Sequence, residues 1–358
     1  MKTVICAISG GIDSAVSAGL LKEAGFEVVG VFMRFWTDSP RANRCWSREA
    51  ELRARKIAKI LKIPFYVFNF EKEFKKRVVD YFLKNYQKGI TPNPCVVCNK
   101  EIKFGLMLEK AIRLGADFVA TGHYARTSLL SLKFSNKEKI RLFRAKDKNK
   151  DQSYFLWKLN QKQLKKILFP LGDYRRREVQ KLAKYFGLSF LLKVRKSVEV
   201  CFVRKDIDEF LKKYLKEKPG LIMDTKGRVI GEHKGLWFYT IGQRRKIGLP
   251  GGPWWVVNKN QRKNILIVTK NEKDLLKKKM VVKKVNWISG KEPKIPLEVK
   301  TKVRYLSGLA QSQIIKKLGR GKFLVEFKRA QRAITPGQSA VFYQGEEVIG
   351  GGIICNQA

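Results

Sequence analysis

The first 125 or so residues alternate short apolar runs with segments in which apolar residues recur at helical spacing. Each apolar run has the length of a buried strand, and the runs fall at 4–8, 27–33, 65–68 and 117–121. Helical spacing is found between them, at 49–61, 74–82 and 104–114. Strands that alternate with helices predict an α/β domain with a doubly wound parallel sheet, in which ligands bind at the carboxyl ends of the strands.

The pattern changes twice along the rest of the chain. Residues 150–215 have a mostly helical pattern, and glycine, proline and tryptophan interrupt the stretch from Pro219 to about 257, which indicates a small second domain. From about 278 short strands prevail, and 297–305 alternate strictly, so that one face is buried and the other is basic except for Glu298. We therefore expect a catalytic domain at 1–205, a small central domain at 206–277 and a C-terminal β-barrel at 278–358. The lysine-rich run 270–284 is either a linker or part of an RNA-binding face.

The charge of the chain indicates a polyanionic partner. Lys plus Arg is 76 and Asp plus Glu is 31, which gives a net charge of +45. Nucleic acid is favoured over a membrane surface, because no apolar run reaches the roughly 18 residues of a membrane-spanning helix. A lysine-rich proteome with a solvated surface explains part of the excess.

The six cysteines are expected to be core residues, metal ligands or reactive thiols. The chain begins directly with a predicted strand rather than with an export signal, so we expect a cytoplasmic protein in a reducing compartment. A structural disulfide framework is therefore disfavoured for the cysteines, which are Cys6, Cys45, Cys95, Cys98, Cys201 and Cys355.

A glycine turn lies between the first predicted strand and the helix that follows it. It reads SGGIDS, from Ser9 to Ser14. Gly10 and Gly11 let the backbone approach a phosphate, and the N–H groups at the start of the helix point towards it. Asp13 supplies a carboxylate suited to Mg²⁺. No lysine follows the second glycine, so this is not a Walker A loop. The turn resembles the pyrophosphate loop of enzymes that split ATP into AMP and pyrophosphate.

A second segment, TPNPCVVCNKEIKF at 91–104, presents two cysteines just before a predicted helix. Cys98 lies near the expected helix N-terminus and close to Lys100 and Lys103, so we expect its thiol pKa to be lowered and its sulfur to be a nucleophile. Half of a zinc site and a pair of ordinary thiols are the alternatives. Zinc is disfavoured because the chain has no second CxxC.

For the other candidate site residues, an ordinary structural role is about as well supported as a functional one. His123 follows a strand end, where it is either a substrate contact or a structural histidine. Asp151 begins a polar and aromatic stretch that suits base binding, or it is a helix N-cap. Residues 242–246 bind RNA phosphates or form a solvated turn, and residues 335–338 have the composition of an ordinary turn. Cys201 alone is typical of a core cysteine.

Taken together, the motifs resemble those of the bacterial tRNA-specific 2-thiouridylase family. The match spreads in order over essentially the whole chain and consists of SGGIDS, TPNPCVVCNKEIKFG, TGHYAR, KDQSYFLW, VCF, FYTIGQRRKIGL, QRAITPGQ and GEEVIGGGII. The resemblance implies an adenine-nucleotide α-hydrolase-like fold. It also implies ATP-dependent 2-thiolation of the wobble uridine (U34) of tRNA, by adenylation of O2 and sulfur transfer from a cysteine persulfide.

The resemblance also implies roles for individual residues. Cys98 matches the catalytic nucleophile and Cys201 the cysteine that carries the persulfide, and Asp13 is the third residue expected to be catalytic. Nucleotide-binding positions are Ala7, Ile8, Ser9, Gly10, Gly11, Ile12, Asp13, Ser14, Met33 and Gly122. Positions that contact tRNA are Asn93, Pro94 and Cys95 at the target base, with His123, Lys150, Asp151, Gln152, Arg304, Tyr305 and Gln338. The implied cofactors are ATP and Mg²⁺, and the implied partners are the tRNAs for Lys, Glu and Gln and a persulfide donor such as a cysteine desulfurase or relay protein.

Three departures from the family pattern leave alternatives open. Lys196-Ser197-Val198 stands where Asp-Ser-Gln is usual, Arg53-Ala54-Arg55 where Asp-Ala-Arg is common, and Cys95 where many relatives have Asp. The third change allows a 4Fe-4S cluster on Cys95, Cys98 and Cys201 as an alternative route for sulfur. Another adenylating enzyme of the same superfamily, and an RNA-binding protein with a degenerate ATP site, are the competing functions.

Overall fold

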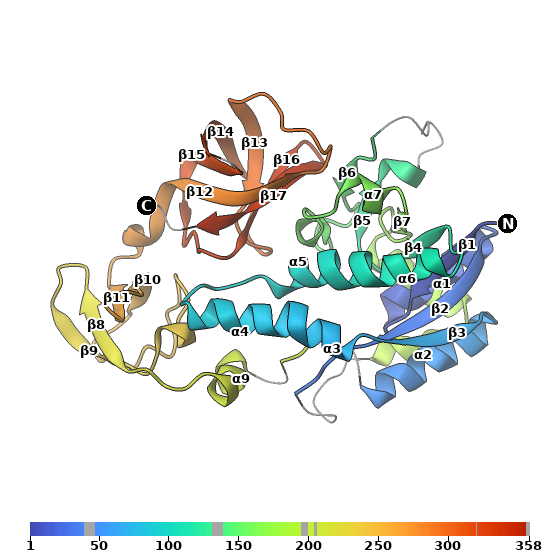
Figure 1. Cartoon of the computed structure of the whole chain (residues 1–358), viewed down its shortest axis with the longest axis horizontal. Coiled ribbons are helices and arrows are strands. Elements are labelled where there is room, and N and C mark those ends of the chain that lie inside the picture. Colours follow the sequence, from blue (N-terminus) through green and yellow to red (C-terminus); the bar gives the residue numbers. More distant parts are fainter. Residues whose placement is uncertain (39–46, 131–138, 195–199, 204–205, 320, 356–358) are drawn as a thin grey trace.

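The computed structural model describes residues 1–38, 47–130, 139–194, 200–203, 206–319 and 321–355. An α/β unit forms one end of an elongated molecule, and a small sheet and a β-barrel lie towards the other end (Figure 1). Among the described residues, no helix has the length and apolar character needed to cross a bilayer. The Lys196-Ser197-Val198 departure and Cys45 lie outside the described residues.

The N-terminal unit contains a five-stranded parallel sheet in the order β3-β2-β1-β4-β7. The strands are β1 (Thr3–Ala7), β2 (Glu27–Arg34), β3 (Phe65–Asn69), β4 (Phe118–Ala120) and β7 (Ile167–Leu168). The predicted doubly wound fold is therefore confirmed. The strand order reverses between β1 and β4, so the segments that follow these two strands flank the crevice where such sheets bind ligands. These segments are the SGGIDS turn and Gly122.

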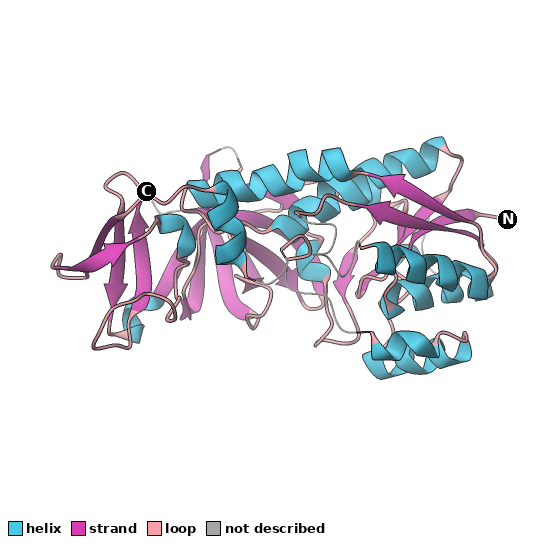
Figure 2. Ribbon diagram, turned by 90° about the horizontal axis from the view of Figure 1, so that it is seen from below, coloured by secondary structure: helices cyan, strands magenta, loops and turns pink. Residues whose placement is uncertain are grey.

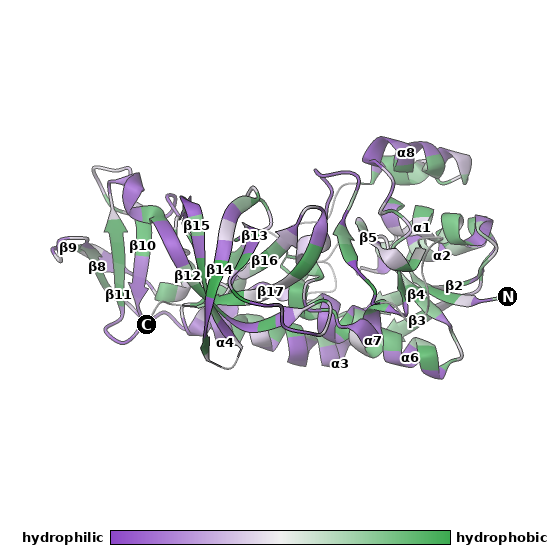
Figure 3. Cartoon of the chain, turned by 90° about the horizontal axis from the view of Figure 1, so that it is seen from above, coloured by the Kyte–Doolittle hydropathy of each residue, from purple (hydrophilic) through white to green (hydrophobic). Residues whose placement is uncertain are grey.

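Helices cover both faces of this sheet (Figure 2). Val4 and Cys6 of β1 pack towards α1 (Ile12–Glu23), α2 (Arg48–Leu61) and α8 (Arg176–Tyr185). Ile5 and Ala7 pack into the opposite core, because successive strand side chains point to opposite faces. The strands are mainly hydrophobic (Figure 3), as expected for a sheet that is buried on both sides.

Two long helical runs build the second core. The first comprises α3 (Glu71–Phe74), the π-helical η1 (Lys75–Val79) and α4 (Asp80–Gln87). The second comprises α5 (Pro94–Cys98), the π-helical η2 (Asn99–Leu106) and α6 (Met107–Arg113). It begins at Pro94, so the helix predicted from 104 started too late. Proline fits the first helical turn, where its missing N–H costs nothing, and Asn93 caps the helix by accepting from the Val96 N–H at 3.4 Å.

The central unit is a four-stranded sheet in the order β10-β11-β8-β9. Its strands are β8 (Gly220–Asp224), β9 (Val229–His233), β10 (Trp255–Asn260) and β11 (Ile265–Thr269), and η6 (Leu236–Phe238) connects β9 to the segment before β10. Ile222, Val256 and Leu266 form its small core. Helix α9 (Ile207–Tyr214) precedes it in the chain and packs into the second core of the α/β unit through Phe210 and Leu211.

The predicted C-terminal barrel is confirmed as a closed six-stranded structure. Its strands are β12 (Leu276–Trp287), β13 (Leu297–Lys302), β14 (Ala310–Gly319), β15 (Lys322–Arg332), β16 (Ser339–Gln344) and β17 (Glu347–Cys355). The pairing of β12 with both β15 and β17 closes the barrel. From Leu276 onwards the lysine-rich run is thus a barrel strand, preceded by η7 (Glu272–Leu275), so the linker interpretation is wrong there.

The segment from Ala125 to Lys193 follows β4, and its part from 150 onwards is less helical than the pattern of 150–215 predicts. Its first strands, β5 (Ala125–Thr127) and β6 (Leu142–Arg144), leave the parallel sheet and extend the barrel sheet from β17. The elements after β6 are mostly short: η4 (Ser153–Phe155), α7 (Gln161–Leu164), β7, α8 and η5 (Ser189–Lys193). Tyr154 and Trp157 from this segment share one hydrophobic core with Tyr343 of the barrel. Packing against the barrel replaces the helices that the local pattern favours.

Candidate functional site

The SGGIDS turn is held in one conformation by packing and internal hydrogen bonds. Gly10 has φ +76°, and a Cβ atom there would lie 2.4 Å from the Ala50 carbonyl oxygen, so only glycine fits. The Ser14 hydroxyl accepts from the Ser9 N–H at 3.1 Å and donates to the Gly11 carbonyl at 3.0 Å. Gly11 is the N-cap of α1 and supplies no side-chain cap, so the N–H groups of the first helical turn face the loop.

Gly122 lies directly against this turn. A Cβ atom at Gly122 would lie 2.6 Å from the Ser14 amide nitrogen and 2.7 Å from the Asp13 carbonyl carbon. The structure therefore brings together two of the predicted nucleotide-binding segments, which are more than a hundred residues apart in sequence. Four further predicted positions are buried, namely Ala7, Ile8, Ile12 and Met33.

Asp13 sits at the mouth of the turn and is held by two residues that the sequence analysis did not identify. Its Oδ1 atom accepts from the Tyr124 hydroxyl at 2.8 Å and from Nη1 of Arg176, at the start of α8. The Asp13 side chain is 38% exposed. A carboxylate that is partly open to solvent at a phosphate-binding turn suits Mg²⁺, which prefers oxygen ligands and keeps several waters.

Arg53, one of the departures from the family pattern, contributes to the same turn. Its Nε atom donates to the Gly10 carbonyl at 3.2 Å. The carbonyl of the left-handed glycine is thereby fixed by a guanidinium.

His123 is buried, 8% exposed, beside the turn. Its Nδ1 lies 2.7 Å from the Thr121 hydroxyl, and its ring contacts those of Phe104 and Phe169. Burial, and secondarily the charge of Lys103, lowers the pKa of His123 well below its usual 6.5. A neutral, buried ring favours the structural interpretation over the predicted tRNA contact.

The TPNPC segment is held in place by the barrel. Nε2 of Gln338 donates to the carbonyls of Thr91 and Pro92 at 3.1 and 3.2 Å. A Cβ atom at Gly337 would lie 2.7 Å from the Thr91 carbonyl oxygen. The turn at 335–338 is therefore a clamp on this segment, and it positions Asn93, Pro94 and Cys95.

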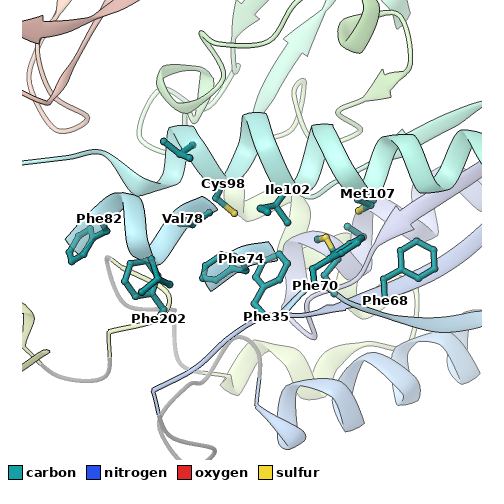
Figure 4. Close-up of a cluster of buried hydrophobic side chains, with 14 of the residues drawn as sticks. Phe35, Phe68, Phe70, Phe74, Val78, Phe82, Cys98, Ile102, Met107 and Phe202 are labelled. Carbon is teal, nitrogen blue, oxygen red and sulfur yellow. The ribbon is translucent and has the colours of Figure 1, made fainter. Parts of the chain in front are cut away.

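Cys98 is buried, which corrects the prediction of a lowered thiol pKa. Its side chain points from α5 into the second core, near Val78 and Ile102 (Figure 4). Burial raises its pKa to about 11 and outweighs the opposing charge of Lys103. Burial also raises the pKa of the Cys95 thiol. The sequence showed the nearby cations, but only the packing shows that the sulfur is removed from water.

Cys201 is half-buried at the edge of the same cluster. The next residue, Phe202, is inserted among aromatic rings, with ring centroids 5.8 Å from Phe74, 5.2 Å from Phe82 and 5.6 Å from Phe210. In Figure 4, Phe202 enters the cluster from the side opposite to Cys98. Phe202 therefore anchors the Cys201 turn to the core that contains Cys98.

No disulfide joins Cys98 to Cys201 in this structure. Within the described part of the chain, which includes Cys95, Cys98 and Cys201, no three Cys, His, Asp or Glu side chains are grouped so as to hold a metal ion. This arrangement does not favour the 4Fe-4S alternative.

Lys150, Asp151 and Gln152 have different environments. Lys150 is partly exposed. Asp151 is buried, and its carboxylate accepts from the N–H groups of Ala145 and Ser153, both at 3.1 Å, and pairs with Arg144. It therefore holds the backbone on either side of it, but the N-cap of η4 is Gln152, which makes no side-chain cap hydrogen bond, so the N-cap interpretation of Asp151 is wrong. The Gln152 side chain accepts from the Tyr124 N–H at 3.1 Å.

Arg304 and Tyr305 lie at the barrel side of the site. Arg304 is exposed. The Tyr305 ring lies 4.5 Å from Phe155 and 6.0 Å from Tyr154. Tyr154 in turn donates to the Ser339 carbonyl at 2.9 Å and interacts with Asn93. Tyr154 from η4 thus borders the TPNPC segment, with Tyr305 and Arg304 of the barrel next to it.

Comparison with known proteins decides which family this arrangement belongs to. Three family models match in order: the tRNA methyl transferase HUP domain at 2–205, the tRNA methyl transferase PRC-barrel domain at 208–270 and the aminomethyltransferase beta-barrel domain at 277–354. The tRNA-specific 2-thiouridylase MnmA of Clostridioides difficile is 42% identical over 99% of this chain and 98% of the relative. The MnmA of Moorella thermoacetica is 44% identical over 97% and 98%, and MnmA 1 of Caldanaerobacter subterraneus subsp. tengcongensis is 45% identical over 98% and 97%.

This chain belongs to the tRNA-specific 2-thiouridylase family. The family resemblance stated from the motifs is thereby confirmed. Within this 2-thiouridylase fold, the glycine turn, Gly122 and Asp13 form one group of contacts, and the TPNPC segment, Tyr154 and the barrel form another.

Sequence reasoning missed Tyr124 and Arg176 for different reasons. Tyr124 directly follows His123 at the end of a strand that borders the crevice, so its position carried a usable signal. Arg176 is one of three consecutive arginines at the start of a basic helix, and nothing local distinguishes it from its neighbours.

Proposed function

We propose that this 2-thiouridylase uses ATP to replace O2 of the wobble uridine of tRNA by sulfur. The observation that carries the proposal is the packing of Gly122 against Asp13 and Ser14, which completes a phosphate-binding turn at the strand-order reversal. The near full-length match to tRNA-specific 2-thiouridylases supplies the substrate class.

In the first step the uridine O2 attacks the α-phosphorus of ATP, and the bond to pyrophosphate breaks. The α1 N-terminus and the Ser9 and Ser14 hydroxyls receive the pyrophosphate, since they offer hydrogen-bond donors and a positive helix end. Asp13 is the residue that would hold Mg²⁺, whose charge stabilises the polyphosphate.

In the second step sulfur displaces AMP. The terminal sulfur of a persulfide on Cys201 forms a bond to C2 while the C2–O bond to AMP breaks. The Cys98 thiolate then attacks Sγ of Cys201, which releases the thiocarbonyl and leaves a Cys98–Cys201 disulfide. An external reductant with two electrons and two protons restores the thiols, and a persulfide donor such as a cysteine desulfurase reloads Cys201.

The burial of Cys98 sets a requirement on this step. With a pKa near 11 the thiol is almost fully protonated at neutral pH. The attack therefore needs Cys98 to be exposed to the substrate, and Lys103 is the cation that favours its thiolate.

The proposal is tested by reconstitution with tRNA transcripts for Lys, Glu and Gln, ATP, Mg²⁺ and a cysteine desulfurase with cysteine. Mass spectrometry of the nucleosides measures 2-thiouridine, and a separate assay measures pyrophosphate. We expect Cys98→Ser and Cys201→Ser to abolish 2-thiouridine while pyrophosphate release persists, and Asp13→Asn to reduce both.

Cys355→Ser is the matched control, because that thiol donates to the Val281 carbonyl in the barrel and has no part in the scheme. Full 2-thiouridine formation by both cysteine variants would overturn the persulfide scheme, whereas pyrophosphate release without any 2-thiouridine in the unmodified chain would point to another adenylating activity. Binding of tRNA without any pyrophosphate release would indicate an RNA-binding protein with an inactive ATP site.

A further inference from the structure

Two chains of hydrogen bonds lead from one segment of the protein to the side chain of Asp13. The segment is 147–152, which we call the RNA-contact segment because it contains the predicted tRNA-binding positions Lys150, Asp151 and Gln152. Both contacts of Asp13 fall on Oδ1, one from Tyr124 and one from Arg176. Each of these two residues is in turn held by the RNA-contact segment.

The first connection runs through Asp147. Its Oδ2 atom accepts from the Arg176 N–H at 2.9 Å, at the start of α8, and its Oδ1 atom accepts from the Asn149 N–H at 3.1 Å. The Asp147 carbonyl accepts from the Lys150 N–H at 3.1 Å. A shift of this turn therefore moves the first residue of α8, which carries the guanidinium that holds Asp13.

The second connection runs through Gln152 and Tyr124. The Gln152 side chain accepts from the Tyr124 N–H at 3.1 Å, and the Gln152 N–H donates to the Tyr124 carbonyl at 2.8 Å. Tyr124 is 2% exposed, and its ring is fixed in the core of the α/β unit. Its hydroxyl reaches Asp13 at 2.8 Å. The backbone of Tyr124 is thus tied to the RNA-contact segment and its side chain to the nucleotide turn.

We propose that Asp147 and Tyr124 are positioning residues through which RNA bound at the RNA-contact segment orients the Asp13 carboxylate for nucleotide binding. The inference rests on the proposed function, since it assumes RNA at 147–152 and ATP at the glycine turn. It adds that the two ligands bind cooperatively, and that the cooperativity depends on these two side chains.

Electrostatics gives the physical reason. A carboxylate at the mouth of a phosphate site repels a polyphosphate unless a cation lies between them, so the orientation of Asp13 and Arg176 affects nucleotide affinity directly. Coupling of this kind is reciprocal: if RNA tightens nucleotide binding by some factor, nucleotide tightens RNA binding by the same factor. A uridine-modifying enzyme would thereby bind ATP more tightly when its RNA is present.

The test is calorimetric titration of the full chain with α,β-methylene ATP and Mg²⁺, with and without a tRNA transcript. This analogue cannot release pyrophosphate, so the titration measures binding alone. We expect the transcript to tighten binding at least roughly 5-fold in the unmodified chain, within the usual range of such couplings. Asp147→Ala and Tyr124→Phe should both show a ratio below about 2-fold, and Tyr124→Phe, which lies outside the RNA-contact segment, should bind the transcript alone as the unmodified chain does.

Asp173→Ala is the control, because this carboxylate is 72% exposed, lies in the loop before α8 and pairs only loosely with Arg126 at 3.7 Å. It should keep the full ratio. Tyr124→Phe removes a single oxygen atom, so this variant should fold even if Asp147→Ala loosens α8. Asp147→Asn repeats the test at position 147 with a side chain of the same shape.

The outcomes separate the two proposals. If the unmodified chain binds both ligands and forms 2-thiouridine but shows no coupling, the inference is wrong and the proposed function stands. If Asp147→Ala and Tyr124→Phe both keep the full ratio, the coupling uses other residues and the inference is again overturned. If the unmodified chain binds neither nucleotide nor tRNA, both proposals are wrong.

Discussion

The packing of Gly122 against the glycine turn allows one substitution to be analysed quantitatively. In Gly122→Ala the added methyl group would lie 2.6 Å from the Ser14 amide nitrogen and 2.7 Å from the Asp13 carbonyl carbon. Both neighbours are backbone atoms at the start of α1 and cannot rotate away. The turn, β4 or both must move, and such overpacking costs about 1–3 kcal/mol.

The cost should appear in nucleotide affinity and in stability. Because about 1.4 kcal/mol corresponds to a factor of ten, a displaced turn should weaken ATP binding by roughly 5- to 150-fold. Strain that remains in the free protein should lower the melting temperature by roughly 2–4 °C per kcal/mol for a domain of this size. Calorimetric titration with ATP and a thermal melt measure the two effects.

Gly308→Ala is the matched control for this prediction. A Cβ atom at Gly308 meets nothing within 4 Å, and the residue lies in the barrel loop between β13 and β14. It should leave both ATP affinity and melting temperature unchanged. If Gly122→Ala leaves both ATP affinity and melting temperature unchanged, the argument that Gly122 packs tightly against the nucleotide turn is refuted.

Three further predictions concern charge and protonation. The rate at which iodoacetamide alkylates Cys98, measured by mass spectrometry, should rise about tenfold per pH unit between pH 8 and 10, since burial raises the pKa of this thiol to about 11. A rate that reaches a plateau below pH 9 would contradict this. The free energy of unfolding should fall as the pH falls from 7 to 5, because His123 binds a proton in the unfolded chain but stays neutral when buried in the folded one. This slope is at most about 1.4 kcal/mol per pH unit for one group, and His123→Asn should reduce it. An equal slope in the variant would show that His123 titrates normally. The affinity for tRNA should fall steeply as the salt concentration rises. Arg304→Ala should lower the slope of log affinity against log salt concentration by about one and leave the affinity for ATP unchanged. An equal loss of ATP affinity would show that Arg304 does not act through RNA.

The helix around Cys98 shows where local sequence arguments fail. The two cysteines were expected to precede a helix, yet both lie within a helix that begins at Pro94 and that Asn93 caps. Proximity to cations suggested a reactive thiolate, yet the side chain points into an apolar core. Spacing along the chain specifies which charges are near in sequence, but solvent exposure depends on the helices and loops that pack from elsewhere.

Motifs with a local physical requirement were predictable. The glycine turn needs its residues in consecutive order, since the left-handed glycine and the helix N-terminus are features of one short segment. The strand–helix alternation and the alternation of 297–305 likewise follow from local periodicity, and they gave the parallel sheet and the barrel.

What the sequence by itself determined, then, is the class of fold, the family and the presence of a phosphate-binding turn, because periodicity and contiguous motifs carry this information. Only the tertiary structure decided which residues contact one another. Tyr124 and Arg176 meet at Asp13, Gln338 clamps the segment at Thr91, and Phe202 inserts beside Phe74. These contacts join residues far apart along the chain, and their partners are selected by packing of whole elements, which no local pattern records.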